Sequence, residues 1–339
     1  MKINDNRMPA LIGGFGKIKT SVPAPNFQLA EPIKINLSAK NNEQFPKFNL
    51  GPYLAGLIEA DGSIAVHDKD SKAKKYNPKI LVVFSLPDKP LADKLCSVTG
   101  VGTVYLKVNA NYVIWQIQNL NDVIVIINII NGYMRTPKIE ALHRAIDWYN
   151  VNKNTIIDKK ELDKSDIDSN SWLAGFTDGD GNFAINLMDR KKRNVITTKR
   201  VQLFFRIELR QNYHRDVLSN LGGISYFYIL NKIATYLEVN LYSRTRQQGD
   251  KIFHSFMVIS HNHNSHKKVL DYFNKFPLFS SKHMAYKDWS HLLHKILLRD
   301  GQPLSQEDIK EIEFIKSQFN NKRKSFNFSH LNNLIYLVN

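Results

Sequence analysis

One unusual stretch occurs twice in the chain, as Leu54-Ala-Gly-Leu-Ile-Glu-Ala-Asp-Gly-Ser-Ile64 and as Leu173-Ala-Gly-Phe-Thr-Asp-Gly-Asp-Gly-Asn-Phe183. The copies are too far apart for a solenoid, and their spacing suits a duplicated domain. Each copy places an aspartate, Asp61 or Asp180, in the last turn of a short predicted helix, just before a glycine. The C-terminal end of a helix is negative and disfavours an acid. Because this unfavourable placement of an aspartate occurs in both copies, we infer that positive charge lies beside both acids.

Small residues recur four positions apart in both copies, as Gly56 with Ala60 and as Gly175 with Gly179. Small side chains at this spacing let two helix backbones approach closely. The simplest arrangement packs the two small faces together, so that the two aspartates emerge side by side. Neighbouring carboxylates have raised pKa values unless a cation compensates them. Such an oxygen-rich pair suits Mg²⁺, which keeps several waters and readily takes phosphate oxygens as ligands.

The residues after each predicted helix alternate between apolar and polar and therefore predict a strand. We expect Gly62 and Gly181 to adopt the left-handed conformation that commonly ends a helix. Further along the first half, residues 79–84, 100–107 and 112–118 predict strands, and residues 89–98, 122–130 and 138–149 predict helices. Each half should therefore begin with a helix, a glycine and a strand.

With these features the chain resembles the LAGLIDADG homing endonucleases, in the single-chain form that carries two motifs. Leu54 to Gly62 differs from the string that names the family by Glu59 in place of Asp, and Leu173 to Gly181 is a common variant. The resemblance covers roughly residues 48–320. It implies a monomeric α+β protein of two pseudo-symmetric αββαββα halves, whose two four-stranded antiparallel sheets form a saddle over DNA.

The resemblance also implies how the motif residues act. In this family the eighth motif residue binds the catalytic metal ions and the seventh contributes its backbone carbonyl group. This correspondence assigns metal binding to Asp61, Asp180, Ala60 and Gly179. The sixth residue, Glu59 or Asp178, is not a catalytic position in the family. We interpret both as polar groups on the helix surface or across the helix interface.

The family has a basic residue near each active centre, after the second helix of each half. The matching stretches are Tyr133-Met-Arg-Thr-Pro-Lys138 and Pro277-Leu-Phe-Ser-Ser-Lys282, so the resemblance gives Lys138 and Lys282 a catalytic role beside the two aspartates. The alternative for each is an ordinary solvated lysine at a helix start. A polar residue that positions water often lies on a strand in this family, near Ser85 here, but the second half offers no clear counterpart.

Composition indicates the kind of partner and the compartment. The 339 residues carry a formal net charge of +16, which indicates a polyanionic partner. No apolar run is long enough to cross a bilayer, so we expect no membrane partner. The single cysteine, Cys96, excludes an intrachain disulfide and a cysteine-based zinc cluster. A sequence rich in Lys, Asn and Ile is typical of an AT-rich genome, so we expect a fungal mitochondrial protein, with another organelle as the alternative.

Composition and the resemblance divide the chain into five segments. We expect an N-terminal extension at residues 1–47, a first half-domain at 48–150, a polar linker at 151–170, a second half-domain with longer hairpins at 171–300, and a C-terminal helix and tail at 301–339. Ser305 and Asp308 form a predicted capping box at the start of that helix.

Polar side chains on the predicted strands and hairpins are the candidates for contacts with DNA, because a two-stranded ribbon fits the major groove. For any single lysine we favour a phosphate contact. The first half offers His67, Lys69, Lys72, Lys74, Lys75, Lys107, Asn109, Asn111, Gln116 and Gln118. The second half offers Asn186, Arg190, Lys191, Lys192, Arg193, Lys199, Arg200, Arg206, Arg210, Tyr226, Tyr228, Asn231, Lys232, Asn240 and Arg244. Two dissimilar halves predict an asymmetric double-stranded target of about two helical turns, on the order of 20 base pairs.

The predicted activity is that of a site-specific endonuclease that breaks both DNA strands by metal-dependent hydrolysis, with water attacking phosphorus in line. We expect Mg²⁺ as cofactor, Mn²⁺ as a substitute, and Ca²⁺ to bind without supporting fast cleavage.

Three alternatives stay open. The first is an intron RNA maturase on the same fold, alone or as a second activity with host intron RNA as partner. The second is a DNA-binding regulator with a degenerate motif, although both acids are intact. The third is a histidine-based nuclease built on Ser260-His-Asn-His-Asn-Ser-His266, for which a polar turn is the ordinary explanation, because carboxylate partners are missing nearby.

Overall fold

The computed structural model describes residues 49–67, 76–107, 110–192, 195–215, 225–299 and 301–337, with the backbone alone at 191–192, 195–197 and 335–337. The predicted N-terminal extension, residues 1–47, lies outside these ranges. Within them, every helix is too short or too polar to span a bilayer.

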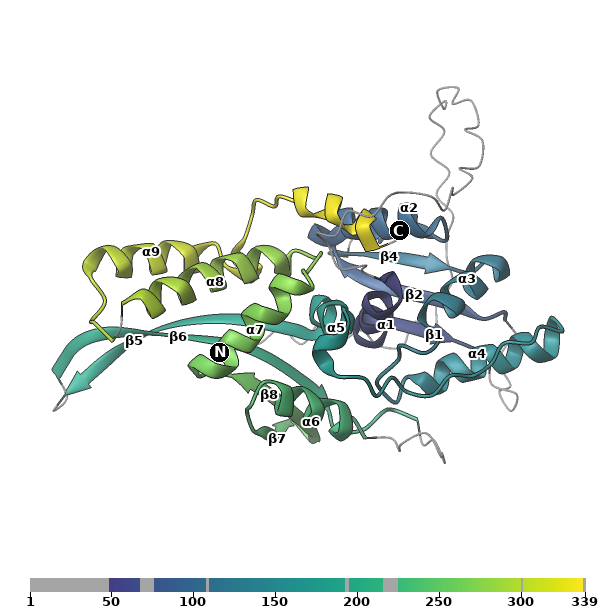
Figure 1. Ribbon diagram of the computed structural model, residues 1–339, viewed down its shortest axis with the longest axis horizontal. Helices are drawn as coiled ribbons and strands as arrows, with labels where there is room; N and C mark the ends of the chain where they lie inside the picture. Colours follow the sequence, from purple (N-terminus) through teal and green to yellow (C-terminus); the bar gives the residue numbers. More distant parts are fainter. Residues whose placement is uncertain are drawn as a thin grey trace, which may run out of the picture. The chain divides into compact units, whose positions relative to one another are not determined.

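The first half follows the predicted order of elements (Figure 1). These are α1 (Leu50–Asp61), β1 (Gly62–Ala65), β2 (Lys79–Ser85), α2 (Lys89–Thr99), β3 (Thr103–Leu106), β4 (Tyr112–Ile117), α3 (Leu120–Ile130) and α4 (Ile139–Asn152). The short 3-10 helix η1 (Leu86–Asp88) follows β2. The four strands pair antiparallel in the order β1-β2-β4-β3 and form the first sheet.

The second half repeats this plan with longer strands. Its elements are α5 (Trp172–Asp180), β5 (Gly181–Lys192), β6 (Val195–Arg210), α6 (Phe227–Tyr236), β7 (Leu241–Gln248), β8 (Lys251–Ser260), α7 (His263–Lys275) and α8 (Lys282–Leu298). Its strands pair antiparallel in the order β5-β6-β8-β7 and form the second sheet. The same order in both sheets confirms the predicted α+β duplication. The segment boundaries predicted from composition stay a prediction.

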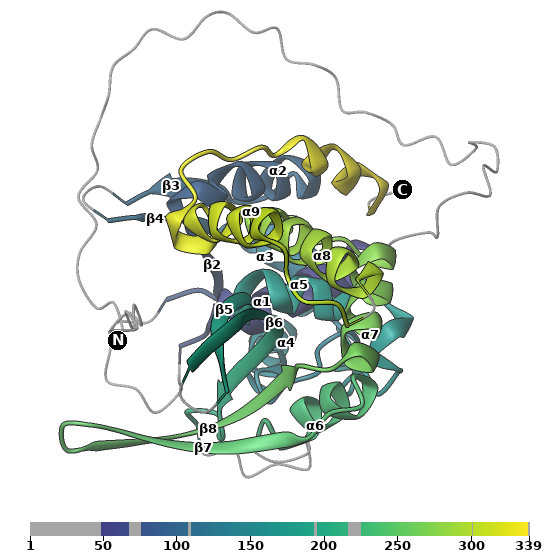
Figure 2. The same cartoon turned by 90° about the vertical axis from the view of Figure 1, so that its left-hand side faces the viewer.

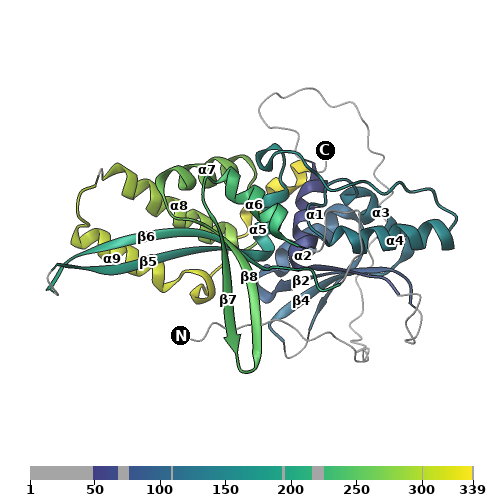
Figure 3. The ribbon, with the colours of Figure 1, turned by 90° about the horizontal axis from the view of Figure 1, so that it is seen from below.

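Within the described ranges, each sheet packs one face against helices and has no helix on the opposite face. Alternate residues of β2, such as Ile80 and Val82, are fully buried, and α1, α2 and α3 pack on this sheet. In the second sheet, Ile207 of β6 and Val258 of β8 are buried in the same way under α6, α7 and α8. We call the opposite face of each sheet its open face. In Figure 3, helices α1, α3, α7 and α8 lie on the same side of the strands.

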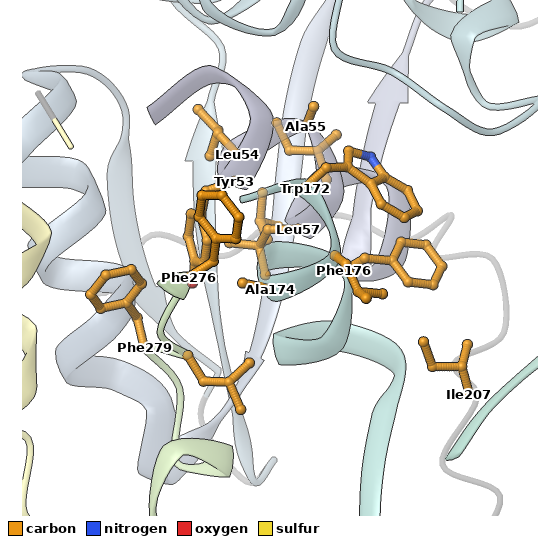
Figure 4. Packing of buried hydrophobic residues seen from close by; sticks show 14 of the residues in the cluster. Tyr53, Leu54, Ala55, Leu57, Trp172, Ala174, Phe176, Ile207, Phe276 and Phe279 are labelled. Atoms are coloured by element: carbon orange, nitrogen blue, oxygen red, sulfur yellow. The ribbon is translucent and has the colours of Figure 1, made fainter. Parts of the chain in front are cut away.

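Helices α1 and α5 join the two halves at an unusually close contact (Figure 4). A Cβ atom placed on Gly56 would lie 2.1 Å from the Trp172 carbonyl oxygen, and one on Gly175 would lie 1.9 Å from that of Tyr53. Only glycine fits such separations. The apolar side chains around the contact include Leu54, Leu57, Ala174 and Phe176. The predicted packing of the two small faces is therefore confirmed.

The glycines that follow the motif helices are needed for a different reason from the predicted one. Gly62 has φ −93° and Gly181 has φ −77°, so both are extended and the left-handed prediction is wrong. A Cβ on Gly62 would lie 2.6 Å from the Ile58 Cα, and one on Gly181 would lie 2.4 Å from the Thr177 Cγ2. The chain turns so tightly from helix to strand that a side chain would strike the last helical turn.

Two further segments connect the halves. Residues 153–170 are irregular apart from η2 (Ile167–Ser169), and Arg135 holds them by an ion pair with Asp163 at 2.7 Å. After α9 (Gln306–Ser317) come η3 (Asn320–Lys322) and η4 (Ser329–Leu337), which returns to α2 of the first half (Figure 1). The predicted capping box of Ser305 and Asp308 begins α9.

Candidate functional site

The two motif aspartates end α1 and α5, where the helices are in contact. A Cβ on Gly179 would lie 3.2 Å from the Asp61 Oδ2, so the Asp61 carboxylate lies against the residue that precedes Asp180. Burial of the Asp61 carboxylate raises its pKa, and the charge of Asp180 raises it further. Asp61 is nevertheless exposed as a residue and Asp180 is half-buried. Both acids are therefore close together and open to a ligand, as predicted.

A lysine ammonium group caps the C-terminal end of each motif helix. Lys138 Nζ donates to the carbonyl oxygens of Ile58 at 3.1 Å and Gly62 at 2.9 Å, with a longer contact of 3.5 Å to Ala60. These carbonyl groups form the negative end of the helix, so the half-buried Lys138 ammonium group is favourable there. The positive charge expected beside the first acid is Lys138, which is not a freely solvated side chain.

The second motif helix has the matching lysine. Lys282 Nζ donates to the carbonyl oxygens of Thr177 at 3.0 Å and of Gly179. Lys138 is the N-cap residue of α4, and Lys282 is the first residue of α8. In each half, therefore, a lysine at the start of a later helix contacts the C-terminal end of the motif helix of the same half.

The sixth motif residue of the first copy fixes the loop that carries this lysine. Glu59 is 3% exposed and accepts hydrogen bonds from the backbone N–H groups of Arg135 at 3.0 Å and Thr136 at 2.6 Å. It also accepts from the Trp172 indole N–H of α5 at 2.6 Å. Burial raises the pKa of Glu59 to about 7, against the lowering effect of these bonds.

Asp178 does the same in the second copy. It accepts from the backbone N–H groups of Phe279 at 2.8 Å and Ser280 at 3.1 Å, and from the Tyr53 hydroxyl of α1 at 2.7 Å. Burial raises its pKa. The interpretation of Glu59 and Asp178 as cross-interface groups is confirmed, whereas the helix-surface alternative is wrong because both are buried.

The charges at the site also interact across the interface. Burial raises the pKa of Asp61, and Lys282 opposes this rise more strongly than Lys138 does. Burial lowers the pKa of Lys138, and among the acids that oppose this effect Asp180 is the strongest. Each lysine thus caps its own motif helix while its charge acts on the acid of the other copy.

The residues at the site fit a hard divalent cation. Two carboxylates and the carbonyl oxygens of Ala60 and Gly179 form an all-oxygen donor set of the kind that Mg²⁺ and Ca²⁺ prefer. Lysine ammonium groups already contact these carbonyl oxygens, but a carbonyl oxygen has a second lone pair. In the part of the chain that the structure describes, no three His, Cys, Asp or Glu side chains cluster around a metal position. Water and phosphate oxygens would have to complete the coordination.

Sequence reasoning missed Asp88, a buried acid that links the first half to the second lysine. Asp88 ends η1 and accepts hydrogen bonds from the Ser281 backbone N–H at 2.5 Å and its hydroxyl at 3.2 Å. Ser281 directly precedes Lys282, and the Ser85 hydroxyl donates to the same carboxylate at 2.6 Å. The partner is 193 residues away, so the local sequence offered no signal beyond a helix-start aspartate.

Several predicted DNA-contacting residues lie on the open faces. Arg210 and Arg244 both pair with Ser255 across the second sheet, on the face opposite the buried Ile207 and Val258. The same face carries Asn186, Arg190, Arg200 and Arg206. In the first sheet Gln116 pairs with Leu81 and Thr103 on the open face, and Gln118 directly follows β4. Lys107 and Asn111 flank the turn between β3 and β4, His67 follows β1, and Asn240 precedes β7.

Other predicted contacts are placed differently from our expectation. Lys199 points to the helix side of β6 and forms an ion pair with Glu313 of α9 at 2.9 Å. Asn231 and Lys232 are on α6, not on a strand, and Lys232 Nζ donates to the Ser165 carbonyl at 2.7 Å. Tyr226 and Tyr228 also belong to the start of α6. The residues after β6 alternate too little to separate strand from helix, which explains this error.

The remaining candidates stay predictions. Lys69, Lys72, Lys74, Lys75, Asn109 and Arg193 lie outside the described residues, as do the side chains of Lys191 and Lys192.

The histidine-rich stretch starts a helix. Asn262 and Ser265 form a capping box for α7. The His266 Nε2 lies 3.0 Å from the Leu203 carbonyl oxygen, and burial lowers the pKa of His266 to about 4. The ring packs edge-on against Trp289. These contacts give Asn262, Ser265 and His266 structural roles.

Comparisons with known proteins agree with this geometry. The sequence profile of the LAGLIDADG endonuclease family matches residues 54–149 and 173–293. The intron-encoded DNA endonuclease aI3 of Saccharomyces cerevisiae is 44% identical over 98% of this chain and 83% of its own length.

Solved structures show the same fold at low sequence identity. The LAGLIDADG homing endonuclease I-GzeII, in complex with its DNA target, superposes with a TM-score of 0.61 at 18% identity, covering 82% of this chain and all of its own. I-SmaMI, bound to uncleaved DNA in the presence of calcium ions, has a TM-score of 0.54 at 18% identity, covering 78% and 97%. Matched motif helices, duplicated sheets and a profile that covers both halves lead to one conclusion: the chain belongs to the LAGLIDADG endonuclease family.

Proposed function

We propose that the protein is a site-specific DNA endonuclease that cuts both strands of an asymmetric duplex in a reaction that requires a divalent cation. One observation carries the proposal: two aspartates from matched helices meet at a glycine-lined contact, each beside a half-buried lysine. The kinship with an intron-encoded DNA endonuclease supports DNA as the substrate.

The proposed chemistry divides among the residues of the site. Asp61 and Asp180 would hold divalent cations, which supply charge stabilisation at the attacking and leaving oxygens when bound. Lys138 and Lys282 would hold the helix ends in place and stabilise negative charge that develops on the phosphate. Glu59 and Asp178 would keep the lysine loops in register with the acids. Because the site is built from two matched halves, each half would act on one strand.

The open faces would hold the DNA. The arginines of the second sheet project away from the helices, where they can reach phosphates and base edges of the major groove. Since both motifs belong to one chain, a monomer would suffice. The difference between the two open faces supports an asymmetric target of about 20 base pairs. Mg²⁺ is the proposed physiological cation, with Mn²⁺ as a substitute and Ca²⁺ permitting binding without fast cleavage. The relative is described as intron-encoded, which supports an origin in an intron, and we propose a mitochondrial location for this chain.

The direct test incubates the purified protein with supercoiled plasmid that carries the intronless form of its host gene, with Mg²⁺, with Ca²⁺ or with EDTA. We expect linear plasmid with Mg²⁺ alone, and a salt-sensitive complex without linear product in Ca²⁺. Tight binding of the host intron RNA with no strand breaks in any condition would replace this proposal by the maturase alternative.

A further inference from the structure

Glu208 places a carboxylate among the arginines of the second open face. Its Oε1 and Oε2 accept hydrogen bonds from Arg246 Nη2 at 2.6 and 2.7 Å, and its Oε1 accepts from the Ser255 hydroxyl at 2.8 Å. Arg244 Nη1 lies 3.7 Å from the other oxygen. One acid therefore contacts two basic side chains and a hydroxyl on neighbouring strands.

The strand register puts all four residues on the open face. Arg244 pairs with Ser255, and Arg246, two positions later on β7, pairs with Phe253, two positions earlier on β8. Glu208 pairs with Met257, in step with Ser255 on β8. Figures 2 and 3 show the β7–β8 hairpin extending beyond the helices. The cluster thus lies on the surface proposed to meet DNA, opposite the face of the sheet that packs against α6, α7 and α8.

Folding stability does not account for this acid. The side chains of Arg246 and Arg244 are 37% and 43% exposed, and ion pairs of partly exposed arginines contribute little to stability. A carboxylate on a basic face also repels phosphate and weakens non-specific binding. An acid in this place is useful when discrimination between sequences matters more than total affinity.

We infer that Glu208 is a positioning residue for sequence recognition, which holds Arg246 so that its guanidinium meets the acceptor edge of a guanine in the major groove. This inference rests on the proposed function, since it assumes that the open face binds duplex DNA. Guanine presents N7 and O6 as acceptors there, and arginine is their common partner. Both bonds to Glu208 come from Nη2, so they do not engage Nη1.

The physical advantage is preorganisation. A free arginine loses rotamer freedom when it docks on a base, and a side chain fixed beforehand avoids much of that cost. Glu208 also cancels one of the two positive charges, which lowers attraction to phosphates of any sequence. Both effects increase the ratio of specific to non-specific binding.

The experiment compares three variants of the full chain: Glu208→Gln, Arg246→Gln and the control Glu313→Gln. The control breaks the Lys199–Glu313 ion pair, which involves the same strand, β6, but lies on its helix side. Each protein is offered a library of randomised duplexes in Ca²⁺, and the bound sequences are read. The sequence that the wild type prefers is then varied one base pair at a time and its binding measured at several salt concentrations. Thermal unfolding confirms that each variant is folded.

The inference predicts that the wild type and the control prefer guanine at one particular position, and that Arg246→Gln loses this preference. Glu208→Gln should lower discrimination at the same position by about three- to tenfold, with other positions unchanged. Unchanged discrimination in Glu208→Gln would overturn the inference. So would an Arg246→Gln variant that binds all sequences less tightly and reduces the salt slope by about one, which identifies a phosphate contact.

Two more outcomes are informative. A change at a different base pair in Glu208→Gln, with the Arg246 position intact, would mean that Glu208 reads a cytosine amino group itself and would also overturn the inference. If the wild type enriches no sequence from the library, the proposed function fails together with the inference. If the wild type enriches particular sequences and Glu208→Gln enriches the same ones equally well, the inference fails but the proposed function stands.

Discussion

The replacement of Gly175 by alanine tests the contact on which the site is built. The added methyl group would lie 1.9 Å from the Tyr53 carbonyl oxygen, whereas real Cβ atoms essentially never approach closer than 3.0 Å. Helices α1 and α5 must therefore separate by about 1 Å at this point, because the obstacle is backbone and cannot rotate away. Alanine itself favours a helix by about 1 kcal/mol over glycine. Crowding in a packed interior costs about 1–3 kcal/mol and occasionally more.

A clash with rigid backbone belongs at the upper end of that range, about 3 kcal/mol. The helix preference of alanine offsets about 1 kcal/mol of it, so we expect Gly175→Ala to lose about 2 kcal/mol of stability. The effect on activity should be larger, since a displacement of about 1 Å at a reacting centre can reduce the rate about 100-fold. Thermal unfolding gives the first quantity, and the rate of plasmid linearisation gives the second. Cleavage should fall much further than the fraction of folded protein does.

Gly100→Ala is the matched control. Gly100 ends α2 with φ +68°, and a Cβ there would meet nothing within 4 Å. Its substitution should cost about 1–2 kcal/mol through the left-handed backbone alone and leave the cutting rate of the folded protein intact. If Gly175→Ala unfolds at the wild-type temperature and cuts at the wild-type rate, the close helix contact does not set the geometry of the site.

Further predictions concern the lysines, the motif acid and a buried histidine. Lys138→Met and Lys282→Met should each slow the cutting of one strand by about 100-fold, so nicked circles accumulate on a gel; rapid linearisation by both variants would argue against a catalytic role. Glu59→Gln puts an amide N–H₂ group toward N–H donors that include the Trp172 indole. We expect the free energy of unfolding, measured in urea at pH 8, to fall by about 1–3 kcal/mol. Burial lowers the pKa of His266 to about 4, below its unfolded value of about 6.5. Its neutral form therefore stabilises the fold above pH 6.5, and this contribution is lost as the pH falls toward 4. The urea unfolding midpoints at pH 7 and pH 5 should differ less in His266→Gln than in the wild type. An equal difference would mean that another group causes the loss of stability in acid.

Much of the site was visible in the sequence because its parts are repeated. The spacing of Gly56 and Gly175 relative to the two aspartates predicts a close helix pair with adjacent acids, and the structure contains it. Lys138 and Lys282 came from the family resemblance, since nothing in the residues near them shows that they return to a helix end far away in the sequence. Their exact partners, the helix-end carbonyl groups, are visible only once the chain is folded.

The rest depended on tertiary contacts that no local pattern encodes. Glu59 is buried because it satisfies the N–H groups of a distant loop, and a sequence rule treats an acid in a helix as solvated. Asp88 contacts Ser281 across the two halves. Lys199 differs from Arg200 by one position, and the alternation of a strand puts them on opposite faces. Sequence composition marked both as basic, but only the register assigned them to different surfaces.

We propose that Asp61 and Asp180 together hold the cations needed to cut both strands. The most direct measurement converts each acid separately, as Asp61→Asn and Asp180→Asn, and follows supercoiled target plasmid in Mg²⁺ beside DNA binding in Ca²⁺. We expect that neither variant produces linear plasmid, while both still bind the target with the sequence preference of the wild type. Linear product at the wild-type rate from either variant would contradict it.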